Sequence, residues 1–247
     1  MLLRMLFGAI AVLGALALPA AAQEALSPET VDHLAPPDLL SLRLGQPVAA
    51  QPGPFREHAC GTNGGPQAQP IAGFEAYAAC AAEAETGLHE VTFRYDDELH
   101  YYARAMNNMP IADRFQGTRF GSFPVIVSAL IDGDGIVRGY RAVTDDRVPL
   151  RERRVAYTMG ILAKSRLPGE WTCEDLPLAD GETPVGRVAV KEDCAGTAPD
   201  GQQMLLRSRY LHRKGQTFVD QHSGRIREGL FESTTRLEVF DADWRLP

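Results

Sequence analysis

The alternation of apolar and polar residues predicts its clearest strand at residues 117–132. There Val125 and Val127 alternate with residues that are also largely apolar. Because both faces of this segment are apolar, we expect the strand to be covered on both sides of its sheet. The Asp-Gly-Asp-Gly sequence at 132–135 is typical of a hairpin turn. Residues 136–144 are therefore predicted to return as the partner strand.

Helical periodicity flanks this hairpin. We predict amphipathic helices at 71–85, 97–107 and 150–166, because apolar residues recur there every three or four positions. In the last of these, the apolar stripe consists of Val155, Met159 and Leu162. Gly87 is placed to end the first helix, and residues 88–95 are predicted to follow as a strand.

The C-terminal third has the pattern of strands separated by turns. Strands are predicted at 185–190, 203–212, 216–219 and 230–240. Turn residues that recur every few positions favour an antiparallel meander. We therefore predict an α+β fold with two disulfides. A lead-in arm (23–54) precedes a helix–sheet N-terminal part (55–168), and a mostly antiparallel β C-terminal part (169–247) follows.

The N-terminus has the layout of a secretory signal peptide over residues 1–22. Arg4 provides a positive charge, residues 6–18 are an apolar core, and alanines precede a predicted cleavage site after Ala22. A membrane anchor is disfavoured because the apolar run is shorter than the ~20 residues that a span requires. We expect a periplasmic or secreted protein, with the periplasm favoured and no transmembrane span after cleavage.

The chain has 4 cysteines, which in an exported protein most simply form two disulfides. Of the three connectivities, we favour Cys60–Cys80 with Cys173–Cys194, because it places one closed loop in each half. A zinc site is disfavoured by the wide spacing within each pair. Each pair is followed by a strand that includes tyrosine, which suggests an internal duplication. However, the first loop is predicted to be helical and the second extended, so only two local loops are expected.

Composition and motifs exclude several functions. The net charge of −7 argues against broad nucleic-acid binding, which requires basic residues to neutralise phosphates. The chain lacks the histidine spacing of zinc hydrolases, a nucleophile elbow and a phosphate-binding glycine loop. We therefore predict no catalytic residue, no metal site and no cofactor. Acidic residues around Glu83 and Glu90 are interpreted as a solvated face.

A basic run opens the predicted 150–166 helix. It consists of Arg147, Arg151, Arg153 and Arg154. Basic residues at a helix N-terminus oppose the helix dipole, so their presence favours contact with an envelope protein or an anionic ligand. Our leading hypothesis is a non-enzymatic protein- or envelope-binding module. Two alternatives remain open: a periplasmic hydrolase whose carboxylate or metal site is assembled from distant residues, and a small-ligand binder that uses Tyr101, Tyr102 and Phe120.

Residues 123–143, with the helix that follows and Arg166-Leu167-Pro168, resemble the C-terminal domain of TonB-like proteins in layout. That family combines a hairpin containing an Asp-x-x-Gly turn with a helix and then a strand. The resemblance implies the same order of elements here. The membrane anchor and proline-rich spacer of the family are missing, and no function is carried across.

Overall fold

The computed structural model describes residues 38–53, 55–95, 105–107, 118–219 and 225–245. The predicted signal peptide, half of the lead-in arm and most of the predicted 97–107 helix lie outside these residues. Within the described part of the chain, no helix has both the length and the apolar character needed to cross a membrane.

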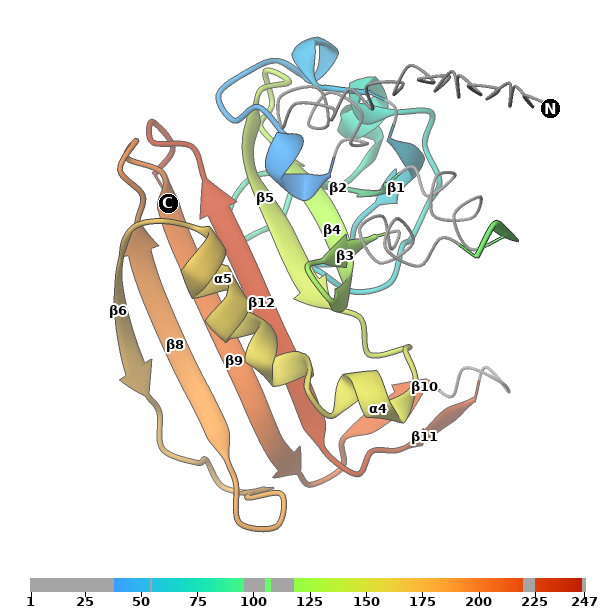
Figure 1. Ribbon diagram of the computed structural model, residues 1–247. Helices are drawn as coiled ribbons and strands as arrows, with labels where there is room; N and C mark the ends of the chain where they lie inside the picture. Colours follow the sequence, from blue (N-terminus) through green and yellow to red (C-terminus); the bar gives the residue numbers. More distant parts are fainter. Residues whose placement is uncertain (1–37, 54, 96–104, 108–117, 220–224, 246–247) are drawn as a thin grey trace, which may run out of the picture. The chain divides into compact units, whose positions relative to one another are not determined.

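The fold is built on a ten-stranded antiparallel sheet (Figure 1). Its main path runs in the order β1 (Arg56–Cys60), β2 (His89–Arg94), β4 (Phe123–Ile131), β5 (Val137–Thr144), β12 (Glu232–Phe240), β9 (Gln203–Arg213), β8 (Val190–Thr197) and β6 (Glu170–Asp175). Off this path, β3 (Arg119–Phe120) pairs with β4, and β7 (Glu182–Thr183) pairs with β9. A separate two-stranded sheet contains β10 (Thr217–Val219) and β11 (Ile226–Glu228).

The main path consists of two meanders that meet at their last strands. The first runs β1-β2-β4-β5 and the second runs β6-β8-β9-β12, each with neighbouring strands antiparallel. β5 and β12 then pair antiparallel, with Arg141 opposite Glu238. One continuous sheet therefore includes strands from both sides of residue 168. In each meander the first strand carries one cysteine, Cys60 in β1 and Cys173 in β6.

The helices are short. They are η1 (Leu39–Ser41), η2 (Val48–Ala50), η3 (Phe74–Ala79), α4 (Leu150–Arg153), η4 (Ala156–Thr158) and α5 (Met159–Arg166). The described residues thus form a mostly antiparallel β structure with few helices, which supports the predicted α+β class only in part. The predicted 71–85 helix is reduced to η3, and the glycine-rich segment before it is irregular.

The predicted 150–166 helix is divided into α4, η4 and α5, because tertiary hydrogen bonds compete with the helical ones. The Tyr157 N–H donates to Ser233 Oγ at 3.2 Å. Thr235 Oγ1 donates to the carbonyls of Ala156 and Tyr157 at 2.9 and 3.0 Å. The apolar stripe is also shifted: Val155 is 49% exposed, whereas Ala156 is buried.

Most strands that were predicted from clear alternation are confirmed. The hairpin turn predicted at 132–135 is also confirmed and connects β4 to β5. The predicted 185–190 strand is wrong, since that segment is a turn with an isolated bridge and β8 starts only at Val190. β1 and β6 were missed. β6 has little apolar alternation, because it is a sheet edge with mostly exposed side chains.

Neighbouring rows of the sheet face opposite sides and differ in polarity. Val91, Ala129, Tyr140, Val239 and Met204 form one cross-strand row of buried apolar side chains. The adjacent row consists of Thr92, Ser128, Arg141, Glu238 and Leu205. The apolar row belongs to the main core, on the side that α5 covers in the second meander (Figure 1). The polar row carries a buried ion cluster.

Arg141 lies at the centre of this cluster with 1% of its side chain exposed. Its guanidinium contacts Glu83 at 2.6 Å, Glu90 at 3.0 Å and Glu238 at 2.7 Å. Arg236 adds a second cation, 2.9 Å from Glu238. The interpretation of Glu83 and Glu90 as a solvated face is therefore wrong: Glu90 is 2% exposed and accepts hydrogen bonds from Ser128 and the Gly64 N–H.

We expect Arg141→Met to lower the free energy of unfolding by about 3–5 kcal/mol, because it leaves buried carboxylates without their main partner. Arg94→Met is the matched control, since its ion pair with Glu57 has side chains 50% and 60% exposed. The control should change stability by less than about 1 kcal/mol. Urea unfolding with disulfides intact measures both, and equal losses would contradict the structural role of Arg141.

The same cluster predicts acid sensitivity. Burial raises the pKa of Glu83 and of Glu238, but hydrogen bonds and charge from Arg141 and Arg236 outweigh burial, so both pKa values lie below the ordinary 4.5. Their contribution to stability is thus present above the unfolded pKa and is lost as pH falls through the folded values. Urea unfolding at several pH values should show a decline below about pH 4.5, with a shallower decline in Arg141→Met. An unchanged free energy down to about pH 3 would contradict the assignment.

Candidate functional site

The second disulfide lies at the edge of the sheet and is accompanied by charged side chains. Both predicted pairings, Cys60–Cys80 and Cys173–Cys194, are confirmed, and the described residues contain no free cysteine. Cys173 in β6 lies directly opposite Cys194 in β8. Cys173 is exposed on the outermost strand, whereas Cys194 is 5% exposed and belongs to the main core.

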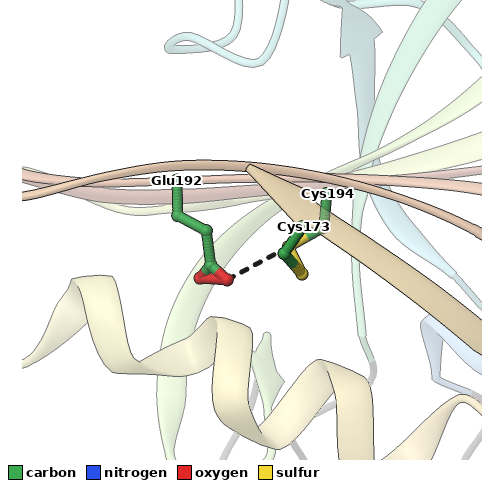
Figure 2. Close-up of side chains that lie close together, drawn as sticks. All are labelled: Cys173, Glu192 and Cys194. Atoms are coloured by element: carbon green, nitrogen blue, oxygen red, sulfur yellow. Dashed lines mark hydrogen bonds between the residues drawn. A yellow bond between two sulfur atoms is a disulfide. The ribbon is translucent and has the colours of Figure 1, made fainter. Parts of the chain in front are cut away.

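The alternation of β8 places a carboxylate beside this disulfide. Glu192 and Cys194 are two residues apart, so their side chains leave the same face of the strand. Figure 2 shows the Glu192 carboxylate directed toward the two cysteines, with Oε1 3.1 Å from Cys194 Sγ. A disulfide sulfur carries no proton, so this contact becomes a hydrogen bond only when Cys194 is a thiol.

Helix α5 adds a cation to the same point. The Lys164 ammonium donates to Glu192 Oε1 at 2.7 Å, and its Nζ lies 3.6 Å from Cys173 Sγ and 3.9 Å from Cys194 Sγ. The helix can approach the sheet because Gly160 has no side chain: a Cβ there would lie 2.6 Å from Ser208 Oγ. Ser208 is opposite Glu192 in the neighbouring strand, so this close approach brings Lys164 over the carboxylate.

The three side chains also have the composition of a metal site. One ligand atom each from Cys173, Glu192 and Cys194 lies within 4.8 Å of the others. Zinc binds thiolate sulfur, however, and here the two sulfurs are joined in a disulfide. The Lys164 ammonium also contacts all three residues. The donor set in its oxidised form therefore does not fit a metal ion.

The four candidate arginines do not converge on one point. Arg147 is held by Asp145 at 2.8 Å, and this hydrogen bond and charge raise its pKa. Arg153 lies over the Phe231 ring, 5.7 Å from its centroid. Arg151, with 85% of its side chain exposed, and Arg154 extend into solvent.

Exposed apolar side chains lie on the chain segment that carries the two solvent-exposed arginines, and on the residue next to Phe231. Leu150 is 42% exposed and Val155 is 49% exposed on the same short helical segment. Leu230, next to Phe231, is 70% exposed. We call this set the α4 surface; it consists of Leu150, Arg151, Arg154, Val155 and Leu230.

The residues proposed for a small-ligand site do not form one among the described residues. Phe120 is 2% exposed within the main core, and Tyr101 and Tyr102 lie outside the described residues. An open groove exists elsewhere, at one end of β6, β8 and β9, where Thr172, Ala195, Leu205 and Arg245 are among the lining residues. The Arg245 guanidinium donates to the backbone carbonyls of Ala242 and Trp244.

No protein family model, curated protein or solved structure matches this chain. Function must therefore be inferred from the geometry. The sequence did not identify Lys164 and Glu192, because the extent of β8 was not predicted. The available signal was the sequence Glu192-Asp193-Cys194. It places the Glu192 and Cys194 side chains on one face only if the segment is extended.

We expect Gly160→Val to lower the free energy of unfolding by about 1–3 kcal/mol, because a branched side chain must displace α5 from Ser208 and Leu206. Gly133→Val is the control, since a Cβ at Gly133 meets nothing within 4 Å. Chemical denaturation compares the two variants. If Gly160→Val were as stable as the control, the close approach of α5 would not be what positions Lys164.

Proposed function

We propose that this protein is a non-enzymatic, extracytoplasmic binding module that contacts a protein partner of the envelope through the α4 surface. The observation that carries the proposal is the combination of large exposed apolar side chains with two exposed guanidinium groups. Val155 follows Arg154 in the chain and is 49% exposed. Leu230 precedes Phe231, the ring that Arg153 covers, and is 70% exposed. Contiguous exposed apolar side chains mark interaction sites, and arginine is enriched in protein interfaces.

The α4 surface is supported by a fixed base, which favours binding without a large ordering penalty. Arg153 packs over Phe231, whose ring is 5.7 Å from Tyr210. Tyr210 in turn stacks on Tyr157, with ring centroids 4.7 Å apart. This row of rings connects the α4–η4 segment to β9 and to the start of β12. The exposed residues are therefore presented by packed elements.

The chemistry of the α4 surface indicates a partner with an acidic and apolar patch. The protein as a whole has a net charge of −7, so a local pair of exposed arginines contrasts with its average surface. Complementary charge accelerates and orients association, while apolar contact provides affinity. Two disulfides with no free cysteine among the described residues support an oxidising compartment outside the cytoplasm.

A photo-crosslinking amino acid at Val155 tests the proposal in cells that produce the protein. We expect a discrete adduct with one envelope protein, which mass spectrometry identifies. The same amino acid at Thr172, an exposed residue of β6, serves as the control and should not give that adduct. The absence of an adduct at Val155, or the same adducts at both positions, would count against this surface.

The identified partner, once purified, allows a quantitative test. We expect the double substitution Arg151→Glu and Arg154→Glu to weaken binding at least about tenfold, because charge reversal makes the contact repulsive. Arg153 is left unchanged, since its stacking on Phe231 is structural. Arg94→Glu combined with Arg187→Glu is the control, because both positions are exposed and the change in net charge is the same. Titration calorimetry gives the dissociation constants, and equal weakening by this control would assign the effect to overall charge.

A further inference from the structure

The two disulfides of this protein have opposite environments. Cys60 and Cys80 are 8% and 4% exposed and pack with Phe74 and other apolar residues of the main core. Cys173 is exposed on the edge strand β6, and only its partner Cys194 is buried. Thiol–disulfide exchange requires an attacking thiolate to reach a sulfur atom. The two disulfides therefore differ in how accessible they are to exchange.

The ammonium group at the edge disulfide also favours exchange. Lys164 Nζ lies 3.6 and 3.9 Å from the two sulfurs, and a nearby ammonium stabilises a thiolate. Exchange is faster when the leaving sulfur is stabilised as a thiolate. Glu192 holds the ammonium in place through a 2.7 Å hydrogen bond. Its carboxylate is also 3.1 Å from Cys194 Sγ, within reach of the proton that a reduced Cys194 carries.

We propose that Cys173–Cys194 is an exchange-active disulfide that accepts two electrons from a dithiol, with Cys173 as the sulfur that is attacked. This inference is independent of the α4 surface, because it depends on different residues and on covalent chemistry. Figure 2 shows the Glu192 carboxylate beside Cys173 and Cys194.

The reaction balances with the dithiol as the only co-reactant. One thiolate of the dithiol attacks Cys173 Sγ, forming a mixed disulfide and breaking the bond to Cys194. The electron pair leaves on Cys194 as a thiolate beside the Lys164 ammonium. The second thiolate of the dithiol then attacks the dithiol's own sulfur in the mixed disulfide and releases Cys173 as a thiolate. The two cysteine thiolates take up the two protons that the dithiol has released. The protein is reduced and the dithiol is oxidised to a disulfide.

Time-resolved alkylation tests the proposal by measuring how fast each disulfide is reduced. Native protein is exposed to dithiothreitol, quenched with iodoacetamide at intervals and mapped by peptide mass spectrometry. We expect Cys173 and Cys194 to become alkylated at least roughly ten times faster than Cys60 and Cys80, since only the edge disulfide is accessible. Equal rates, or faster reduction of Cys60–Cys80, would overturn the proposal.

A trapping experiment tests which sulfur is attacked. The probe is a thioredoxin-type protein whose second active-site cysteine is replaced by serine, so that the mixed disulfide cannot be resolved. We expect a covalent complex through Cys173. A complex predominantly through Cys194, Cys60 or Cys80 would contradict the assignment.

The role of Lys164 is tested with variants that use the buried disulfide as an internal control. Lys164→Met should slow reduction of Cys173–Cys194 roughly tenfold relative to Cys60–Cys80, because the departing thiolate loses its cation. Lys164→Arg should restore most of the rate. A variant that merely loosens the fold would accelerate reduction of both disulfides. An unchanged ratio of the two rates in Lys164→Met would remove the electrostatic basis of the proposal.

Discussion

A buried guanidinium surrounded by three carboxylates joins the two meanders of this protein. Arg141 is in β5 and Glu238 lies opposite it in β12, so their contact crosses the junction between the halves. Removing these charges from water carries a large penalty, which is offset only if every partner is correctly placed. Glu90 meets this condition by accepting backbone hydrogen bonds from the 62–65 loop. The ion cluster therefore fixes both the sheet junction and the loop that covers it.

The two halves share a topology but use their cysteines differently. Each meander carries a cysteine in its first strand, yet Cys60 bonds to a loop residue and Cys173 bonds to the neighbouring strand. The tyrosines that first suggested a duplication are not equivalent, because Tyr95 follows the second strand of its meander and Tyr210 lies within the third. The similarity thus resides in strand order, while the local environment determines the chemistry of each disulfide.

Helix α5 connects these features, because it covers the apolar face of the second meander and also reaches the edge disulfide. Its packing depends on Gly160 and on the hydrogen bonds of Thr235 that divide it from α4. The same division leaves Val155 exposed and creates the α4 surface. A single packing arrangement therefore produces two separate candidate sites, a partner surface at one end and a charged disulfide at the other.

The sequence alone predicted several local features. They are the 132–135 turn, the strands around it, the long final strand and the pairing of four cysteines into two local loops. These features depend on neighbouring residues, through alternation, turn preferences and the short span of each cysteine pair. The tertiary structure alone determined the break at Val155, the burial of Glu90 with the partial burial of Glu83, and the contact of Lys164 with Glu192 and Cys194. Each of these results from contact between residues distant in the chain, where packing and hydrogen bonds across strands override local preference.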